Sequence, residues 1–205
     1  MPCVTVSIMF LIPKDCWEIK QTAEKGRGVY AKKTIEKGVV IGDYLGVLVD
    51  NAEYDLKTDE KGLYLMYYTD RTSIYPDLTK TGPHLINHSC SPNSWIYKSK
   101  NHTLFFAIDT IKQGEEITIS YLLSPKDELC SPCPHGCKCN SKVCTGSMHL
   151  SGKKYIIWQK FQDSQKIGAR VPKIIYGETL KRLPSYPKIK HSNPIYKVIS
   201  LLREV

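Results

Sequence analysis

Five of the eight cysteines in this 205-residue chain lie within residues 130–144. Three of them, Cys137, Cys139 and Cys144, follow a C-x-C-x4-C spacing, and thiolates so placed on a tight loop can fill three positions of a tetrahedral zinc site. The fourth ligand has to come from elsewhere in the chain. This crowding favours zinc and a reducing compartment over a disulfide-bonded secreted scaffold.

A second pair, Cys130 and Cys133, also has the spacing of a metal-binding loop. The pair can supply ligands to a second zinc together with His135 or Cys16, or it can consist of two ordinary thiols. The sequence leaves these alternatives open.

Polar residues also end two apolar, strand-like segments. Asn87 and His88 end the first, and Tyr121 ends the segment 117–121. A glycine-rich turn, Gly26-Arg27-Gly28, precedes both, and such turns let the backbone approach a ligand closely. Each feature alone is equally well explained by ordinary packing, so only their combination indicates a site.

The elements that carry these residues are mostly strands. Residues 1–123 alternate short Val-, Ile- and Tyr-rich segments with turn residues, which is typical of a β-dominated domain. The expected strands are residues 4–12, 39–41, 44–49, 103–108 and 117–122. The apolar segment 4–12 is short and follows no basic region, so we expect a strand there and no signal peptide. A short helix is expected over residues 50–56, and two further helices over 153–166 and 195–204, where apolar residues recur at helical spacing.

The net charge of +9 is concentrated in the last part of the chain, where residues 151–205 hold 12 Lys/Arg against 3 Asp/Glu. A neutral body with a basic tail indicates an acidic partner such as nucleic acid or a nucleosome. A solvated surface that keeps the protein soluble explains the same charge equally well. The sequence has no apolar run of about 18 or more residues, so we expect no association with a membrane.

Four segments, taken in their order and separation, resemble those of the SET-domain lysine methyltransferases. They are KGRGVYA at 25–31, GDYLG at 42–46, NHSCSPN at 87–93 and GEEITISY at 114–121. The resemblance implies a mostly β, SET-domain (β-clip-like) fold of small curved sheets, with short helices in a C-terminal extension. In this fold the segment ending in Tyr121 threads under the loop that contains Asn87, in a knot-like arrangement.

The same resemblance implies a division of the chain. A SET catalytic domain would span residues 15–123 after a leading strand at 1–14, a post-SET-like zinc loop would span 124–150, and a basic C-terminal extension would span 151–205. In the zinc loop, the resemblance makes Cys90 the fourth ligand. The implied ligand set is Cys90, Cys137, Cys139 and Cys144.

The resemblance also implies roles for single residues. Tyr121 matches the catalytic tyrosine, and Tyr44 matches a catalytic aromatic of the lysine channel, whose other candidate residues are Tyr64, Tyr67 and Ile119. The cofactor, S-adenosylmethionine, would be held by Lys25, Gly26, Arg27, Gly28, Tyr30, Asn87, His88 and Tyr121. The chain departs from the family pattern at Asp43, where a glutamate is usual, and at His84, in the loop before Asn87. It departs again at Ile119, whose lack of a hydroxyl favours higher methylation states.

The implied activity is methyl transfer to a lysine side chain in a tyrosine-lined channel, with a histone tail as the substrate. A free lysine has a pKa of about 10.4, so an apolar channel that disfavours the ammonium form is chemically useful. The alternative is a catalytically silent SET scaffold that recruits chromatin or other acidic partners. The presence of Tyr121 together with Asn87 and His88 favours the enzyme. The implied location is intracellular: the nucleus in a eukaryote, otherwise the cytoplasm or a host cell that receives the protein as a secreted effector.

Overall fold

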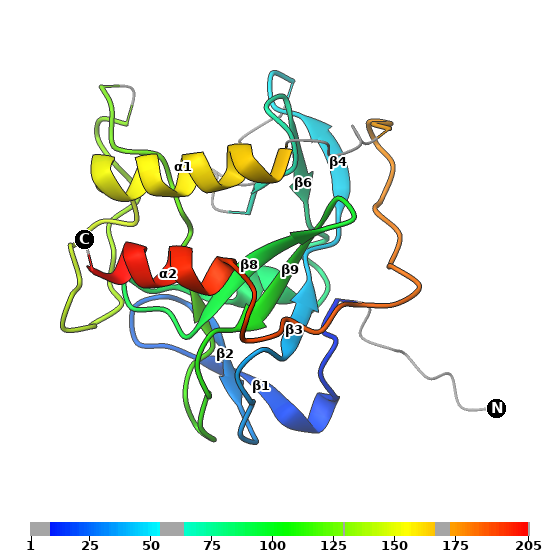
Figure 1. Ribbon diagram of the computed structural model, residues 1–205, viewed down its shortest axis with the longest axis vertical. Coiled ribbons are helices and arrows are strands. Elements are labelled where there is room, and N and C mark those ends of the chain that lie inside the picture. Colours follow the sequence, from blue (N-terminus) through cyan, green and yellow to red (C-terminus); the bar gives the residue numbers. More distant parts are fainter. Residues whose placement is uncertain (1–8, 54–63, 129, 167–172, 205) are drawn as a thin grey trace.

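The computed structural model describes residues 9–53, 64–128, 130–166 and 173–204. Within these ranges, short strands form four small sheets, and two α-helices follow toward the C-terminus (Figure 1). The mostly β architecture expected from the sequence is confirmed, and so are both C-terminal helices, α1 (Gly152–Lys166) and α2 (Ile195–Glu204).

The central sheet has the order β3-β9-β8 and is antiparallel. Its strands are β3 (Val40–Asp43), β8 (Ser94–Ser99) and β9 (His102–Ala107). Every residue of β9 is buried, because one face of this sheet packs on the main core and the other on the two helices. Lys100 and Asn101 turn the β8–β9 hairpin with φ angles of 48° and 65°.

Two further antiparallel sheets flank this one. The first contains β4 (Val47–Asp50), β6 (Thr72–Tyr75) and β5 (Met66–Tyr67), and the second pairs β1 (Trp17–Gln21) with β2 (Arg27–Ala31), after the 3-10 turn η1 (Lys14–Cys16). Gly26 lies in the β1–β2 turn with a φ of 71°, which a glycine adopts without strain.

The fourth sheet brings distant segments of the chain together. Strand β7 (Asn87–His88), which follows the 3-10 turn η3 (Pro83–Leu85), pairs in parallel with β10 (Thr118–Ile119). The register places Thr118 opposite Asn87 and Ile119 opposite His88. The polar ends of the two apolar segments therefore lie side by side, which is the contact that the expected threading requires.

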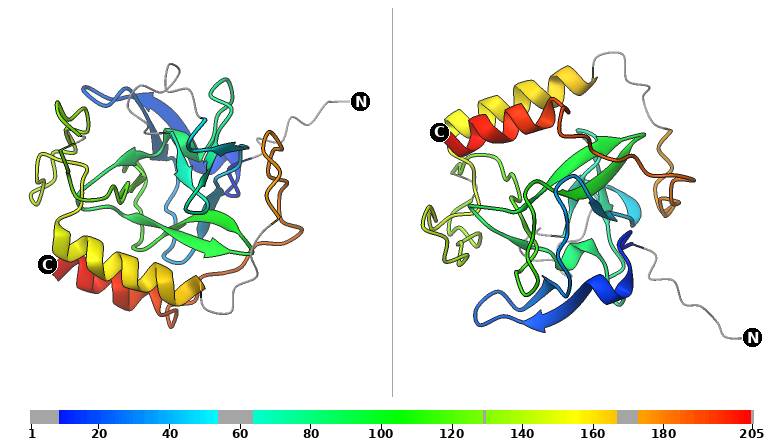
Figure 2. Two further views of the ribbon diagram at one scale, coloured as in Figure 1. Left: turned by 90° about the horizontal axis from the view of Figure 1, so that it is seen from above. Right: turned by 60° about the horizontal axis from the view of Figure 1, so that its bottom comes forward.

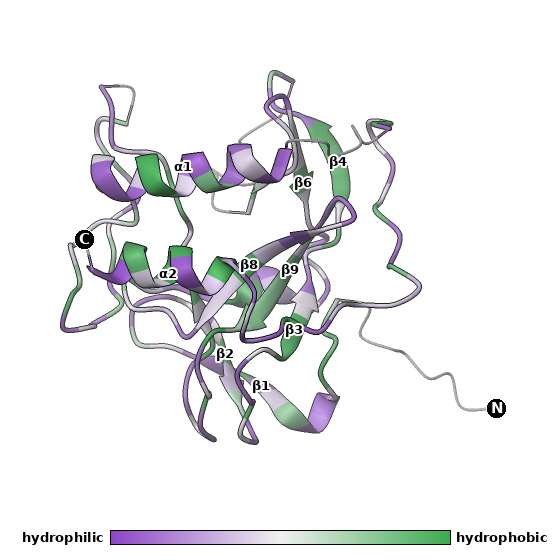
Figure 3. Cartoon of the chain, viewed as in Figure 1, coloured by the Kyte–Doolittle hydropathy of each residue, from purple (hydrophilic) through white to green (hydrophobic). Residues whose placement is uncertain are grey.

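The helices have a core of their own. Figures 1 and 2 show α1 and α2 side by side against the β8–β9 hairpin. Between them lies a buried cluster to which α1 contributes Trp158, α2 contributes Ile195, Ile199 and Leu202, and β9 contributes Phe106. Figure 3 shows the matching alternation of hydrophobic and hydrophilic residues along both helices.

The segment before α2 is also held against the body. Thr179 forms a bridge with Val47, and the Leu180 N–H donates to the Gly46 carbonyl at 2.9 Å. Residues around 179 thus extend the edge of β4. In the part of the chain that the structure describes, neither helix is long and apolar enough to cross a membrane.

Several expected elements differ in extent. Of the expected strand 4–12, Phe10 makes one bridge to Gly42, and residues 4–8 lie outside the described residues. Of the expected helix 50–56, Asp50 ends β4, residues 51–53 form a turn, and residues 54–56 lie outside the described residues. The strand expected over 117–122 is reduced to Thr118–Ile119, the two residues that pair with β7, and the extended chain ends at Leu122, which has a left-handed φ of 55°.

Candidate active site and metal centres

The glycine turn and the Asn87 strand meet through side-chain hydrogen bonds. The Asn87 amide donates to the Arg27 carbonyl at 3.1 Å and to a Glu116 carboxylate oxygen at 2.8 Å. Lys25 forms an ion pair with the other Glu116 oxygen at 2.5 Å. A Cβ on Gly28 would lie 2.7 Å from a Glu116 carboxylate oxygen and 2.9 Å from the Asn87 amide nitrogen, so a larger residue would have to displace both side chains.

The predicted cofactor residues of both segments are therefore neighbours. Tyr30 belongs to the same group, since its backbone bridges to Glu116. Burial, and then the charge of Glu116, raises the pKa of its phenol. Sequence reasoning assigned no role to Glu116. Its only signal was its place in the GEE turn before β10.

His88 connects Tyr121 to the cysteine cluster. The Tyr121 N–H donates to His88 Nδ1 at 3.1 Å, and the two rings lie edge to face with centroids 5.4 Å apart. Because a backbone N–H can only donate, Nδ1 carries no proton and Nε2 carries the ring proton. His88 Nε2 lies 3.6 Å from the Cys90 sulfur, in position to donate to it. Burial, followed by the charge of Lys25, lowers the pKa of His88 to about 4, which keeps this neutral form at pH 7.

A cavity of about 360 Å³ opens beside Tyr121. From the β-rich body, its walls include Tyr44, Ile86, Phe105, Ile119 and Tyr121. The Tyr121 hydroxyl donates to the Ile86 carbonyl at 3.4 Å, and the Tyr44 hydroxyl donates to the Tyr64 carbonyl at 2.7 Å. Tyr44 and Ile119 are both buried, so the inner wall is aromatic and aliphatic.

The two remaining channel candidates lie differently. Tyr67 lines the outer part of the cavity, and its hydroxyl donates to Asp70 at 2.7 Å. The ammonium of the half-buried Lys98 donates to the Tyr67 carbonyl at 2.7 Å, and the burial of this ammonium lowers its pKa to about 8. Tyr64 supports the wall through its carbonyl, and its ring packs edge-on against His84 with centroids 6.1 Å apart.

Helix α1 forms the opposite wall of the cavity. Its lining residues are Tyr155, Trp158, Gln159, Gln162, Asp163 and Lys166. These positions recur every three or four residues, so they lie on one face of the helix. Sequence reasoning predicted the helix but missed this contribution, because helical spacing does not reveal which surface a face will cover.

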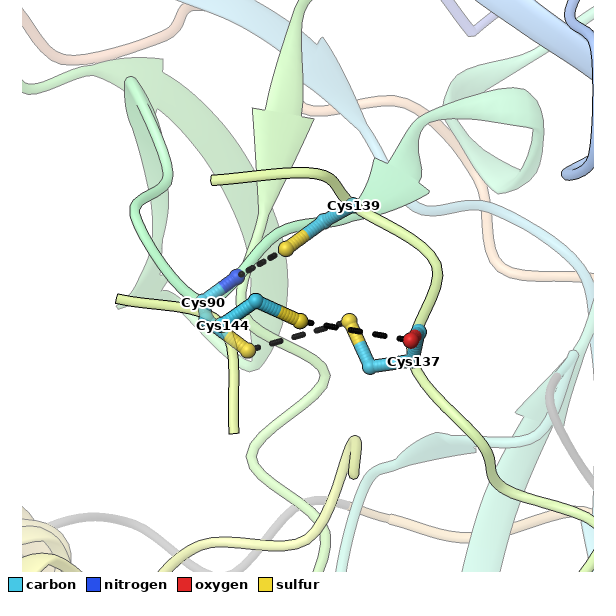
Figure 4. Close-up of side chains that lie close together, drawn as sticks. All are labelled: Cys90, Cys137, Cys139 and Cys144. Carbon is cyan, nitrogen blue, oxygen red and sulfur yellow. Dashed lines mark hydrogen bonds between the residues drawn. The ribbon is translucent and has the colours of Figure 1, made fainter. Parts of the chain in front are cut away.

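The four cysteines of the expected zinc site lie together (Figure 4). The sulfur atoms of Cys90, Cys137, Cys139 and Cys144 all lie within 4.8 Å of one another. The sulfurs of Cys90 and Cys137 are 3.7 Å apart, close to the edge of about 3.8 Å that a tetrahedron with Zn–S bonds of about 2.3 Å requires. The cluster thus joins the loop after β7 to the segment 137–144, with the geometry of a structural zinc site.

Asp43 and His84, two of the residues that depart from the family pattern, are both buried in the fold. Asp43 is fully buried, and one of its oxygens lies 2.8 Å from His102 Nδ1 and accepts from the Tyr186 hydroxyl at 2.9 Å. Asp43 ends β3 and directly precedes Tyr44. Through Asp43, the C-terminal segment that contains Tyr186 is therefore attached to this strand. His84 is buried, and neither ring nitrogen has a hydrogen-bond partner among the described residues.

Comparison with known proteins agrees with this arrangement. The SET domain family model matches residues 26–122. The chain is 35% identical over 120 residues to a variant-silencing SET domain-containing protein of Plasmodium falciparum, an alignment covering 51% of this chain and 5% of that protein. It is 31% identical over 140 residues to the histone-lysine N-methyltransferase trithorax of Drosophila virilis, covering 64% and 4%.

The alignment with a third relative covers a larger share of that relative's length. The chain is 32% identical over 160 residues to an H3 lysine-9 specific histone-lysine N-methyltransferase of Schizosaccharomyces pombe, covering 63% of this chain and 32% of that protein. The chain thus spans only a small part of the length of each relative. Residues 26–122 nevertheless form a SET domain, and with the zinc-type cysteine cluster that follows, the chain resembles the histone-lysine methyltransferases over its β-rich body.

Proposed function

We propose that this protein is an S-adenosylmethionine-dependent protein-lysine N-methyltransferase whose target lysine enters the cavity between the SET domain and α1. The observation that carries the proposal is the position of Tyr121. Its backbone is bonded to His88, beside the expected cofactor residues, while its hydroxyl and ring line the cavity. Tyr121 would therefore lie between the cofactor and the lysine.

The residues around the glycine turn fit a bound cofactor. Lys25, Arg27 and Tyr30 lie close to Gly28 in the chain, the Asn87 amide packs against Gly28 and donates to the Arg27 carbonyl, and His88 follows Asn87 in β7. S-adenosylmethionine supplies a methyl group on a positively charged sulfur. The protein's own task is then to align the amine with that methyl group and to exclude water.

Methyl transfer also requires the lysine amine to be neutral, and the cavity wall favours that form. Tyr44, Phe105 and Ile119 present mostly apolar surface, which disfavours a buried ammonium and lowers the pKa of an entering lysine. Ile119 offers no hydroxyl to hold a water molecule beside the amine. On this basis we propose that more than one methyl group can be added.

The proposed substrate is a histone tail, and the names of the relatives support it. Asp70, Asp163 and Lys166 lie at the cavity wall, and Lys166 pairs with both aspartates. One net negative charge remains in this group, and it favours the approach of a basic peptide. A histone substrate would place the protein in the nucleus of a eukaryote.

The test is transfer of labelled methyl from S-adenosylmethionine to nucleosomes and free histones. Tyr121→Phe should lower transfer by at least about 100-fold, as expected when a polar group at a reaction centre is removed, while cofactor binding measured by calorimetry persists. Tyr196→Phe is the matched control, because the buried hydroxyl of this half-buried tyrosine has no hydrogen-bond partner among the described residues.

Full transfer by Tyr121→Phe would contradict the assigned role. Cofactor binding without any transfer by the wild type, on histones or on lysate proteins, would favour the silent binding scaffold.

A further inference from the structure

We propose that the chain holds a second zinc-class cation at Cys130, Cys133, His135 and His149, a site separate from the four-cysteine cluster. One ligand atom from each residue meets the other three within 4.8 Å. The six separations run from 3.1 Å, for Cys130 Sγ to Cys133 Sγ and for His135 Nδ1 to His149 Nε2, to 3.8 Å, for Cys133 Sγ to His135 Nδ1.

These separations approach those of a filled tetrahedron: the four sulfur–nitrogen distances of 3.4–3.8 Å agree best, while the sulfur–sulfur distance of 3.1 Å is shorter. With Zn–S bonds of about 2.3 Å and Zn–N bonds of about 2.0–2.1 Å, the edges come to about 3.8 Å between sulfurs, 3.6 Å between sulfur and nitrogen, and 3.4 Å between nitrogens. Two thiolates with two imidazoles select zinc over magnesium or calcium, which prefer oxygen ligands. A Cys130–Cys133 disulfide does not fit, because the sulfurs are 3.1 Å apart, well beyond a bond of about 2.05 Å, and because it leaves both histidines unexplained.

The surroundings of His149 orient it as a ligand. His149 Nδ1 donates to the Ser124 carbonyl at 2.6 Å. Since a carbonyl only accepts, the ring proton is on Nδ1 and the lone pair of Nε2 faces the cluster. A backbone partner of this kind is the usual support of a zinc-bound imidazole. The Met148 N–H also donates to the His135 carbonyl at 2.9 Å, which holds the two histidine segments together.

The second site would fasten the chain immediately after Tyr121. Leu122 has a left-handed φ of 55°, a backbone conformation that is strained for a residue with a side chain. Leu122, Leu123 and Ser124 all line the cavity. His149 bonds to Ser124 while the Leu150 N–H donates to the Leu123 carbonyl at 3.0 Å. A cation bound to His149 would thus fix this section of the cavity wall, where the four-cysteine cluster fixes the loop after β7.

The decisive measurement uses the wild-type chain, purified with its metal. Elemental analysis should find about two zinc ions per chain, and X-ray absorption at the zinc edge should give a mean shell of about three sulfurs and one nitrogen, the average of S4 and S2N2 sites. One zinc per chain with an all-sulfur shell would overturn the proposal, whether or not any variant folds.

Variants then assign the ions. Cys130→Ser and His149→Asn should each lower the zinc content from about two to about one and leave an all-sulfur shell. Cys137→Ser should leave one zinc in a mixed sulfur and nitrogen shell. Cys16→Ser is the matched control: Cys16 lies in η1, outside both clusters, and should retain both ions. Two ions retained by both Cys130→Ser and His149→Asn would count against the site.

Discussion

His84 is the least satisfied polar side chain of the cavity wall. Burial, and then the charge of Arg27, lowers the pKa of its imidazole to about 4, while Asp77 acts weakly in the opposite direction. Its ring packs edge-on against Tyr64. The loop that the sequence left without an obvious anchor is therefore held by packing of a neutral imidazole.

This burial makes stability depend on pH. Between the unfolded value of 6.5 and the folded value of about 4, the unfolded chain binds more protons, so the free energy of unfolding falls as the pH falls through this window and is unaffected above it. His84→Leu should remove the effect. When the pH is lowered from 7 to 5.5, the free energy of unfolding of wild type should fall by about 1 kcal/mol more than that of the variant.

The measurement is urea unfolding of the zinc-loaded proteins at both pH values, compared as a difference so that metal release affects both chains alike. His191→Leu, at an exposed histidine, is the control and should show the wild-type slope. An unchanged slope for His84→Leu would mean that the folded chain protonates His84 as readily as the unfolded chain, so that the fold does not lower its pKa.

Single residues also show how far the sequence could be interpreted. The four-cysteine cluster was predictable because three ligands are close in sequence and the resemblance supplied Cys90. His149 was not, because it lies 14 residues from His135 and 19 from Cys130, and only the folded segment brings them together. Glu116 was missed for a similar reason: its partners, Lys25 and Asn87, are distant in sequence.

At the scale of elements, helix α1 does two things at once. Trp158 packs into the core shared with α2, whereas Gln159 and Gln162 face the cavity. The helix was predictable from its apolar spacing. Its position against the SET domain was not, because that position depends on long-range packing on β8 and β9. Short strands such as β7 and β10 were equally hard to delimit, since two paired residues carry no periodicity.

If the cavity receives the target lysine, the α1 glutamines should contact the flanking peptide. The double variant Gln159→Ala/Gln162→Ala should raise KM for a histone peptide about 3- to 10-fold, the effect expected when one or two hydrogen bonds are removed, with kcat and cofactor affinity unchanged. Steady-state kinetics with varied peptide would measure the split. Gln165→Ala, on the same helix but outside the cavity lining, is the matched control; a fall in kcat alone for the double variant would refute a binding role.

At the scale of the whole molecule, the described residues of the basic C-terminal part, 151–166 and 173–204, are folded onto the body. Tyr186 bonds to Asp43, Thr179 bridges to Val47, and α2 is buried along one side. We therefore propose that the three expected regions, 15–123, 124–150 and 151–205, work as one unit. Charge counting could locate the excess of lysines but could not predict that their backbone would be ordered.

This ordering makes the nucleosome proposal testable with few substitutions. Lys153 and Lys160 are exposed on α1. Lys153→Gln/Lys160→Gln should weaken nucleosome binding and reduce the slope of log affinity against log salt by about 1 for each phosphate that is no longer neutralised by a lysine. Transfer to a short peptide should not change. Lys32→Gln/Lys112→Gln, which removes two exposed lysines of the body, is the control; equal weakening by both pairs would point to general charge and not to this helix.

Two parts of the chain line the cavity, and only one of them belongs to the region that matches the SET family model. Tyr44, Ile119 and Tyr121 belong to the part that matches the SET family model, whereas α1 lies beyond it. Substitutions on the cavity face of α1 can reshape the entrance without moving the residues that hold Tyr121. If the cavity holds the proposed methyl transfer, a chain built in this way can acquire a new substrate preference by changing one helix, while the residues around Tyr121 stay as they are.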